Sequence, residues 1–423
     1  MSEPTKKTAL FEWHTGRGAN MANFGGYEMP LWYSSAKNEH LSVLERAGLF
    51  DTSHMAVVML TGPGAHDLLQ RCFSNDLDAC VGPGKRPLVP GRCVYGAFLN
   101  ENGEVIDDSI VNKIANEEFM VVVNAAMGST IADHLKTEGR DAEVNITDLS
   151  DRLGKIDVQG PAAAKIIGKL IKSPESVFEK MPYFSFKGHF DPASVEANTV
   201  LLTDNTPILL SRTGYTGEFG FEIFVSPDRV VEAWEQIYAA GEEFGLTPCG
   251  LAARDSLRGG AVLPLSHQDI GHWPFVNHPW PFALPYAADG KGFTKSFIGD
   301  KALLASGSAD YTHAFVGSDL RKVSISDPAV VIDPDDNEIG SVLTCVTDMG
   351  IGLHEGTIFS VASPDKPEGF KPRGLCCGFV KCSTPLTTGT VVQLKDQRRS
   401  IKVTIVEDVR PNRTARVPIK QML

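Results

Sequence analysis

The stretch SRTGYTGEFGFEIFV, residues 211–225, decides how this chain folds and where its chemistry lies. Three glycines, Gly214, Gly217 and Gly220, punctuate its first half, and this spacing is typical of tight turns and of close approaches between backbone and ligand. The second half, residues 221–225, is rich in β-forming residues. The stretch is therefore predicted to be a turn region followed by a strand.

The carboxylate of Glu222 lies inside this apolar strand. Because side chains alternate along a strand, Glu222 shares a face with Phe224, and the other face carries Phe221, Ile223 and Val225. A carboxylate beside an aromatic ring on a half-buried strand is costly unless a partner satisfies it. Two interpretations fit: a solvent-facing glutamate on an antiparallel strand, or a carboxylate that accepts two parallel N–H bonds from a planar heterocycle.

Length and composition limit the classes of protein to which the chain can belong. Its 423 residues predict two or three domains, and 42% hydrophobic and 22% charged content is ordinary for a soluble globular protein. The net charge of −12 argues against a general nucleic-acid-binding protein, because phosphate contacts need clustered Lys and Arg. No apolar run approaches the roughly 18 residues of a membrane span. The first residues carry no secretory or organelle-targeting pattern, so a cytoplasmic location is expected.

The eight cysteines predict neither a disulfide framework nor a metal site. They are scattered through a long chain, and although Cys376, Cys377 and Cys382 are close in sequence, no CxxC pair or zinc spacing occurs. Free cysteine is commonly a small core residue. All eight are therefore expected to be reduced and mostly buried.

Two adjacent carboxylates form a second candidate site. The dipeptide Asn102-Gly103 lies between two apolar runs, which is a strong hairpin signal. Asp107 and Asp108 fall in the second strand of that hairpin, and alternation sends their side chains to opposite faces. One carboxylate therefore points inward, where burial and the like charge beside it should raise its pKa, as often happens at functional sites. The alternative is one solvated aspartate and one that only caps backbone groups.

Several phrases of the sequence resemble those of the aminomethyltransferase family, the T-protein of the glycine cleavage system. RTGYTGE followed by GFEI is similar to the stretch that helps form the tetrahydrofolate pocket in that family. Further family phrases recur at the opening residues 10–33, at GLFDTSHM (48–55), at GLAARDSLR (250–258) and at FIGDKAL (297–303). The resemblance spans almost the whole chain, but it is weak over residues 260–290 and in the C-terminal region.

The resemblance implies an α+β, multidomain T-protein-like fold. Residues 8–304 are expected to form a folate-binding α/β region of two intertwined subdomains, and residues 305–313 a polar linker. Residues 314–423 are expected to form a C-terminal antiparallel β-barrel, and the residue pattern agrees because short strands alternate there with turns. These strands are predicted at residues 321–325, 329–332, 339–346, 376–382, 389–394 and 400–407.

The family also implies which residues form the site. Asp107, the first residue of the Asp pair, matches the catalytic carboxylate of the family. The pocket that surrounds the folate is expected to include Met55, Tyr95, Asn124, Tyr215, Glu222, Arg254 and Tyr286. No residue is expected to bind a metal.

Simpler interpretations exist for some of these polar residues. Asn124 could act only as the N-cap of a helix running to about Lys136. Arg254 and Arg258, four residues apart, could be a solvated pair on one helical face. His54 invites a catalytic interpretation, but the family does not use this position as its base, so a hydrogen-bonded structural histidine is expected.

The resemblance implies a tetrahydrofolate-dependent one-carbon transferase, most directly an aminomethyltransferase. In the family, a lipoyl-bound aminomethyl group on a carrier, the H-protein, is split so that ammonia leaves and the methylene passes to N5 of tetrahydrofolate. Asp107 is expected to orient N10 and the amine, and Glu222 to hold the amine edge of the pterin. A basic group at Arg254 suits the anionic polyglutamate tail of a folate.

One segment departs from the family pattern and leaves the donor open. By position, the usual Glu is Gly260, the usual Tyr is Ser266 and the usual pocket Trp is Tyr286. Residues 271–285 are unusually rich in Trp, Phe and Pro. The alternative function is therefore a tetrahydrofolate-dependent demethylase or methyltransferase that acts on a small N-, O- or S-methyl donor. A non-enzymatic folate-binding protein is disfavoured, because residues 263–269 lack the cysteine of the motif found in such proteins.

Overall fold

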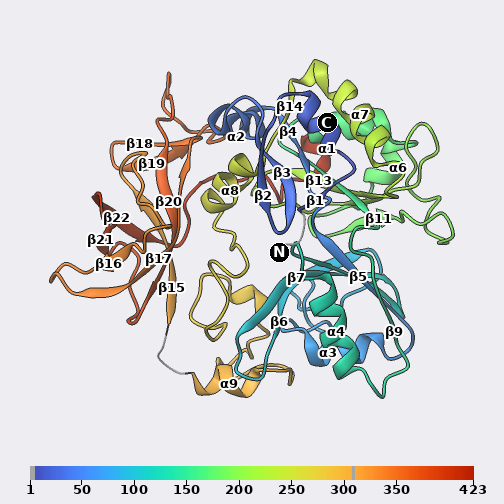
Figure 1. The fold of residues 1–423 in the computed structure, drawn as a ribbon, viewed down its shortest axis with the longest axis horizontal. Helices are drawn as coiled ribbons and strands as arrows, with labels where there is room; N and C mark the ends of the chain where they lie inside the picture. Colours follow the sequence, from blue (N-terminus) through green and yellow to red (C-terminus); the bar gives the residue numbers. More distant parts are fainter. Residues whose placement is uncertain (1–4, 307–309) are drawn as a thin grey trace.

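The computed structural model describes residues 5–306 and 310–423, in which a larger body of two sheets lies beside a closed barrel (Figure 1). A three-stranded sheet of the N-terminal region, in the order β1-β3-β2, lies on the body. Its strands are β1 (Lys6–Lys7), β2 (Asn20–Phe24) and β3 (Tyr27–Trp32), and helix α1 (Phe11–Gly16) lies between β1 and β2 in the chain.

The six-stranded sheet of the body contains the strand predicted at residues 221–225. Its order is β11-β12-β13-β10-β4-β14, and every pairing is antiparallel except that of β14 with β4. The strands are β4 (Ala47–Asp51), β10 (Gly154–Gln159), β11 (Phe186–Gly188), β12 (Leu209–Ser211), β13 (Gly220–Val225) and β14 (Leu246–Pro248). One face is covered by α5 (Ala163–Leu170), α6 (Pro174–Phe178) and α7 (Val230–Gly241).

Alternation along β13 divides its side chains as the sequence predicted. Phe221, Ile223 and Val225 pack with α5, α6 and α7 in one core cluster. Phe224 packs in a different cluster, between the two sheets of the body. Glu222 shares that inner face and is 7% exposed, so the solvent-facing interpretation is wrong.

The five-stranded sheet is antiparallel throughout and has the order β6-β7-β8-β5-β9. Its strands are β5 (Ala56–Thr61), β6 (Arg92–Leu99), β7 (Val105–Ala115), β8 (Glu118–Val123) and β9 (Asn145–Asp148), and its outer face packs against α3 (Ala65–Cys72) and α4 (Gly128–Glu138). The predicted hairpin joins β6 to β7, and Gly103 takes a φ of 75° that favours glycine. The chain leaves the six-stranded sheet after β4 and returns at β10, so the two sheets are intertwined in sequence.

The C-terminal region forms the predicted antiparallel barrel, closed in the order β15-β20-β17-β16-β21-β22. The barrel strands are β15 (Tyr311–Gly317), β16 (Val330–Ile332), β17 (Glu338–Asp348), β20 (Leu375–Cys382), β21 (Val391–Lys395) and β22 (Ser400–Val406), with a hairpin of β18 (Ile351–His354) and β19 (Thr357–Ser360) beside them. Residues 307–309 of the predicted linker lie outside the described residues, and β15 already begins at Tyr311. The exact domain limits stay predictions.

The strand predicted at residues 321–325 is wrong. Val323 is 2% exposed and fills the barrel interior, which explains the apolar signal. The backbone N–H of Ser324 donates to the Asp396 carboxylate at 2.7 Å rather than to a neighbouring strand. The carboxylate of Asp396 therefore accepts the backbone hydrogen bond that a neighbouring strand would accept in a sheet.

Helix α8 (Leu251–Gly260) connects the body to the barrel. It packs against α2 (Ala36–Glu45) and β3 on one side and against β17 and β20 on the other. A short helix, α9 (Asp300–Ala305), precedes the barrel, and 3-10 turns lie at Glu242–Phe244, Pro281–Ala283 and Ile419–Gln421. Within the described ranges, we find no helix with the length and apolar character that a bilayer crossing requires.

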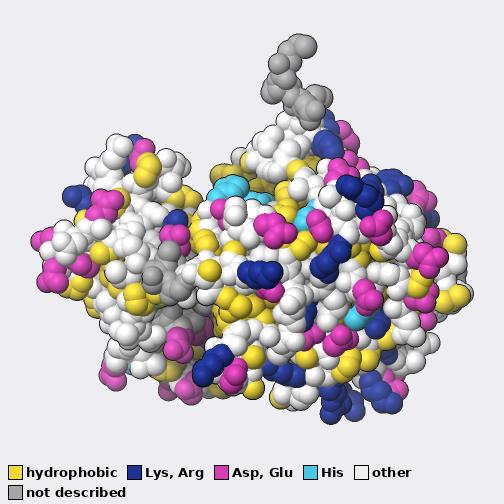
Figure 2. Space-filling model, turned by 90° about the horizontal axis from the view of Figure 1, so that it is seen from below, with side chains coloured by type: hydrophobic (Ala, Val, Ile, Leu, Met, Phe, Trp, Pro, Cys, Tyr) yellow, Lys and Arg dark blue, Asp and Glu magenta, His cyan; other side chains and the backbone are white. Residues whose placement is uncertain are grey.

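Charged side chains of both signs are interspersed on the face drawn in Figure 2, and they do not gather into one basic patch. This distribution agrees with the negative net charge of the chain. As predicted, all eight cysteines are free and most are buried; Cys80 is half-buried.

Candidate functional site

Asp107 and Asp108 lie on β7 at a break in the register of the sheet. Phe98 of β6 pairs with Asp107 and Leu99 pairs with Val105, so Ile106 is an extra residue on β7. Bulges of this kind re-aim side chains and are over-represented beside active sites. The Nε2 atom of His267, in the loop after α8, forms a hydrogen bond with the carbonyl of Ile106 at 2.9 Å and so contacts the bulge directly.

Asn124 brings the two carboxylates together. Its backbone N–H and its side-chain amide donate to Asp107 at 2.9 and 2.8 Å, and the same amide donates to Asp108 at 2.7 Å. The hydroxyl of Tyr95 donates to Asp108 at 2.8 Å, and that of Ser266 donates to Asp107 at 3.0 Å. Asn124 is therefore not an N-cap: α4 begins only at Gly128, and its capping residue is Met127.

The environment of the Asp pair disfavours its negative charge. Burial, and then the charge of Asp108, raise the pKa of Asp107 to about 7. Burial also raises the pKa of Asp108, although hydrogen bonds from Tyr95, Asn124 and Ser266 oppose the shift. No Lys, Arg or His of residues 5–306 and 310–423 forms an ion pair with either carboxylate. The pair can therefore hold or release a proton near neutral pH.

A second cluster of carboxylates lies on the inner face of the six-stranded sheet. Lys155 of β10 donates to Asp157 at 2.7 Å and to Glu222 of β13 at 2.5 Å. Arg254 of α8 donates to the other oxygen of Asp157 at 3.1 Å. Thr213 donates to the remaining oxygen of Glu222. Cations and anions thus alternate along one buried chain, which we call the Lys155 network.

The Lys155 network favours the charged form of Asp157. Burial alone would raise the pKa of Asp157, but Lys155 and Arg254 outweigh it and hold the pKa below its usual range. The side chains of Lys155 and Asp157 are 3% and 0% exposed. Arg254 is partly accessible, with 12% of its side chain exposed, whereas Arg258 is 0% exposed and bound to Asp269. The interpretation of these two arginines as a solvated pair is wrong.

Tyr215 lies between the Asp pair and the Lys155 network. Its ring contacts the guanidinium of Arg254, with 4.8 Å between the guanidinium carbon and the ring centroid. Its hydroxyl donates to the carbonyl of Pro264, and burial, with the charge of Asp108 adding to it, raises the pKa of that hydroxyl. Met55 joins the same group, because its sulfur accepts from Arg254 at 3.7 Å.

A cavity of about 560 Å³ opens beside Tyr215 and Arg254. Its walls come from β2, α2, α8 and the barrel. Apolar residues line much of it, among them Leu31, Leu251, Ala252, Leu265, Val346 and Met349. This combination of apolar walls and a few convergent polar groups is characteristic of small-molecule sites.

The structure brings together most, but not all, of the residues predicted from the sequence. Met55, Tyr215, Glu222 and Arg254 belong to the Lys155 network or touch it, and Tyr95 and Asn124 bind the Asp pair. The ring of Tyr286 packs on Phe293 with 5.3 Å between centroids, against the same core cluster as Tyr95, and among the described residues it forms no hydrogen bond with the other predicted site residues. Phe282, 58% exposed, instead lies against the ring of Tyr95 at 5.9 Å.

Sequence reasoning missed Lys155 and Asp157. The signal was present, because polar residues alternate with Ile156 and Val158 along the strand sequence GKIDVQ, yet every residue of β10 is buried. A polar stripe on a fully buried strand indicates partners across the sheet. Those partners, Glu222 and Arg254, come from distant parts of the sequence.

His54 is buried, as expected of a structural histidine, but its Nδ1 atom has no hydrogen-bond partner among the described residues. Burial, and then the charge of Arg254, lower the pKa of His54 to about 4. Its ring packs edge-on against Phe24 with 5.5 Å between centroids. His54 is therefore a neutral, buried residue near the charges of the Lys155 network.

The departure at Gly260 has a structural explanation. A Cβ atom at this position would lie 1.8 Å from Oδ2 of Asp348, so no larger residue fits without a shift. Asp348, from barrel strand β17, binds Arg410 and also accepts from His40 at 2.8 Å. Arg410 in turn binds Glu218 at 3.1 Å and the carbonyl of Thr216. The barrel thus supports the turn that carries Tyr215.

Comparison with known proteins identifies the family. The sequence profile described as "GCVT N-terminal domain" matches residues 10–273, which is more than half of the chain. The chain belongs to this family. The aminomethyltransferase of Lysinibacillus sphaericus (strain C3-41) is 33% identical over 344 residues, which are 81% of this chain and 86% of that protein. The aminomethyltransferase of Symbiobacterium thermophilum is 36% identical over 323 residues, covering 76% and 80% of the two chains.

The fold agrees with the family. The crystal structure of glycine cleavage system aminomethyltransferase T from Bartonella henselae matches with a TM-score of 0.72 and 26% identity, covering 95% of this chain and 97% of that one. The T-protein-like fold and the main functional interpretation, a one-carbon transferase of the aminomethyltransferase type, are thereby confirmed. The roles of individual site residues stay predictions.

Proposed function

We propose that this chain transfers the methylene of an aminomethyl group, carried by the lipoyl arm of a partner protein, to tetrahydrofolate with release of ammonia. In this transfer the carbon–sulfur bond to the carrier and the carbon–nitrogen bond to the amine break, and bonds from the methylene to N5 and N10 form. The two protons displaced from N5 and N10 end on the thiol and on ammonia. The main support for this proposal is that the Asp pair and the Lys155 network lie on either side of Tyr215. The relatives of the chain are aminomethyltransferases, which supports the same reaction.

The residues present suit a folate. The cavity volume of about 560 Å³ falls within the roughly 300–1,000 Å³ of small-molecule sites, and its apolar walls suit a flat heterocycle. Glu222 keeps acceptor capacity beyond its bonds to Lys155 and Thr213, because a carboxylate has about four lone-pair sites. We assign it to the N–H edge of the pterin, with Arg254, Met55 and Tyr215 as the surrounding wall.

The Asp pair is the group suited to manage protons. Asp107 is 0% exposed, and both of its oxygens already accept from protein donors, whereas Asp108 is partly exposed. We therefore assign contact with the reacting amine to Asp108. Asp107 is assigned the role of shifting the protonation of Asp108 through its neighbouring charge. This assignment differs from the sequence-based hypothesis that Asp107 itself is the contact. General acid–base catalysis by a positioned carboxyl group contributes roughly 10²–10⁴-fold.

Two variants decide between the carboxylates. Asp108→Asn should lower turnover by about 10²-fold or more, while tetrahydrofolate still binds. Asp107→Asn should lower turnover less and shift its pH dependence, because it removes a neighbouring charge. Full activity in Asp108→Asn combined with an inactive Asp107→Asn would restore Asp107 as the contact residue.

The reaction itself is tested by mass spectrometry of the folate product. The protein is incubated with tetrahydrofolate and an aminomethyl-loaded lipoyl carrier, and separately with a panel of methylated amines and ethers. We expect 5,10-methylene-tetrahydrofolate from the loaded carrier alone. 5-Methyl-tetrahydrofolate from a small donor, with no response to the carrier, would overturn the proposal.

One observation keeps the demethylase as the second candidate. Ser266, where the family pattern has Tyr, donates directly to Asp107 at 3.0 Å. Ser266 is smaller than the tyrosine of the family pattern, and the aromatic segment 271–285 follows it. Both differences concern the part of the site that we expect to face the one-carbon donor. The small-donor panel of the same experiment tests this candidate.

A further inference from the structure

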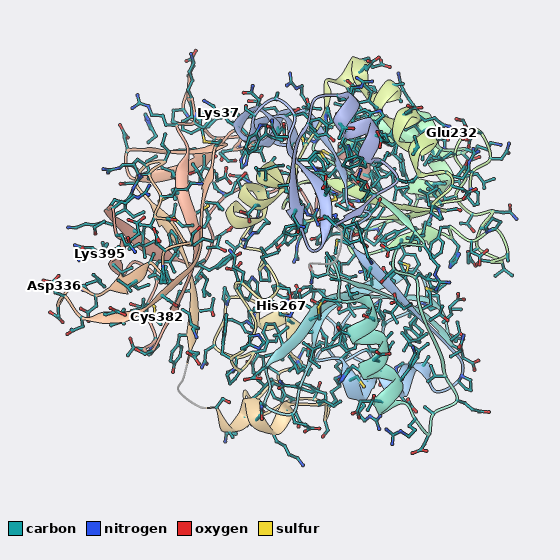
Figure 3. The ribbon with its side chains drawn as sticks, viewed as in Figure 1. Lys37, Glu232, His267, Asp336, Cys382 and Lys395 are labelled. Atoms are coloured by element: carbon teal, nitrogen blue, oxygen red, sulfur yellow. The ribbon has the colours of Figure 1, made fainter. Side chains whose placement is uncertain are left out.

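His267 binds the backbone of the bulge that directs the Asp pair. Ile106 is the extra residue of this bulge, and such a residue is left without a partner in the hydrogen-bond ladder of a sheet. A carbonyl oxygen only accepts, so the Nε2 atom of His267 is the donor in the bond of 2.9 Å. Figure 3 labels His267 beside the sheet that contains β7. A side chain from another segment thus fixes the residue that precedes Asp107.

The turn that leads to His267 has a strained backbone that its surroundings hold in place. Val262, at the start of the turn, has a φ of 57° and His267 has a φ of 62°, in the left-handed region that non-glycine residues seldom adopt. The indole of Trp280 donates to the carbonyl of Val262 at 2.8 Å. The backbone N–H of Leu265 donates to Asp269 at 2.9 Å. Strain of this kind persists where the surrounding structure over-determines the conformation, and it is frequent at functional sites.

Buried polar contacts connect the same turn to the barrel. Asp269 is 0% exposed and binds Arg258 of α8, and its other oxygen accepts from Thr344 of β17 at 2.7 Å. The turn is therefore anchored to α8 and the barrel rather than to the five-stranded sheet. Through Ser266 and His267 it contacts the part of β7 that carries the Asp pair.

We propose that His267 is a positioning residue of the Asp pair: its bond to Ile106 holds the bulge so that Asp107 stays beside Asp108 and Asp108 faces the reacting amine. The inference rests on the proposed function for the role of Asp108, and it adds a residue outside the two carboxylate clusters. Ser266 bonds only the carboxylate of Asp107, so it does not fix the backbone of the bulge. Misplacement of a catalytic group by about 1 Å can lower a rate by roughly 10²-fold.

Three variants separate the hydrogen bond from the backbone strain. His267→Gln keeps a side-chain N–H donor, whereas His267→Gly removes the donor and suits the left-handed backbone. Neither variant has an imidazole, so titration of the ring itself cancels when the two are compared. The matched control is His272→Gln, because His272 is an exposed histidine of the same loop and forms no hydrogen bond or ion pair with residues 5–306 and 310–423.

The first readout is turnover with the loaded carrier, measured together with folate affinity. We expect His267→Gly to lower kcat by about tenfold or more, while the dissociation constant for tetrahydrofolate, measured by calorimetry, stays within about twofold of wild type. His267→Gln should recover most of the lost turnover, and His272→Gln should behave as wild type. Full turnover in His267→Gly, or turnover in His267→Gln as low as in His267→Gly, overturns the inference.

The second readout does not need the transfer reaction. The wild type should lose stability between about pH 4 and pH 7, because the folded state keeps the proton of Asp107 that the unfolded state releases. Loss of the bond to the bulge lets the carboxylates separate, so this pH-dependent loss should be smaller in His267→Gly than in His267→Gln. The titratable groups that face the pair, Tyr95 and Tyr215, are the same in both variants.

Urea unfolding at several pH values measures this difference. A stability change in His267→Gly that is equal at every pH would report only the greater chain entropy of glycine and would overturn the inference.

The two readouts separate this inference from the proposed function. If the wild type transfers nothing from the loaded carrier, the proposed function fails, but a weaker pH dependence in His267→Gly than in His267→Gln would still support His267 as the residue that positions the Asp pair. If the wild type transfers the methylene and neither readout distinguishes the two variants, only the inference is overturned.

Discussion

The two clusters of the site each contain two carboxylates and lie on either side of Tyr215, yet they have opposite electrostatics. The Asp pair contains two anions and only neutral donors, and the pKa of Asp107 rises to about 7. The Lys155 network contains as many cations as anions, and the pKa of Asp157 falls below its usual range. One arrangement suits proton transfer and the other suits a permanent binding charge.

The comparison shows what decides the behaviour of a buried carboxylate. Burial raises the pKa of both Asp107 and Asp157, so burial does not distinguish them. The difference lies in the partners: a second carboxylate and an amide in one case, a lysine and an arginine in the other.

The largest effect is expected from Asp157→Asn. This change removes the anion that pairs with both Arg254 and Lys155, and leaves Lys155 with Glu222 as its remaining anion. Removing one partner of a buried ion pair costs about 3–5 kcal/mol of unfolding free energy. Urea unfolding measures the loss. The matched control is Asp133→Asn, because Asp133 is 76% exposed and pairs with Lys136 only at the surface; its effect should stay below about 0.5 kcal/mol. Equal effects of the two changes would show that the network does not need its anion.

The Asp pair should make the protein less stable as the pH rises. Because the pKa of Asp107 is raised from 3.8 to about 7, the folded state keeps a proton that the unfolded state loses in this window. The unfolding free energy should therefore fall between about pH 4 and pH 7 by on the order of 3 kcal/mol from this group. In Asp108→Asn this fall should shrink, since the neighbouring charge no longer raises the pKa of Asp107. Urea unfolding at several pH values checks the slope, and an unchanged slope in the variant would contradict the coupling.

Glu222→Gln should weaken tetrahydrofolate binding by about 10- to 100-fold with little change in kcat, because a hydrogen bond to a charged group contributes about 1.5–3 kcal/mol. Steady-state kinetics separates KM from kcat. Glu232→Gln on α7, where the side chain is 51% exposed and pairs with Arg229 at the surface, is the control and should behave as wild type. A loss confined to kcat would place Glu222 in the proton chemistry instead.

The smallest effect is expected from Tyr286→Phe. The ring of Tyr286 packs on Phe293, and this contact survives the change. Turnover and folate affinity should both stay within about twofold of wild type, as for a surface substitution of roughly 0.5 kcal/mol or less. A loss of tenfold or more in either quantity would show that Tyr286 reaches the ligand, as the sequence suggested.

The sequence predicted secondary structure correctly where the pattern depended on neighbouring residues within one strand or turn. The β-forming run at residues 221–225 and the dipeptide Asn102-Gly103 each gave the observed strand or hairpin, because alternation and turn chemistry depend on neighbouring residues. The segment 321–325 misled, because Val323 fills the barrel from an irregular segment. An apolar residue indicates burial but does not tell which backbone partner it has.

The family and the mixed α+β fold with its barrel could be predicted from the sequence, because family motifs and strand alternation are local patterns. The adjacent charges of the Asp pair pointed to a raised pKa, but the burial and the distant partners of each carboxylate come from the tertiary structure. Asp107 and Asp157 look alike in sequence, and only the folding of β8 and α8 against them places an amide beside one and an arginine beside the other. The structure also places Lys155 against Glu222 and Ser266 against Asp107, contacts that the sequence did not predict. The physical reason is that the pKa and binding role of a buried charge depend on every partner within a few ångströms. Asp108 and Lys155 are near in sequence, but Asn124, Ser266 and Arg254 come from distant segments.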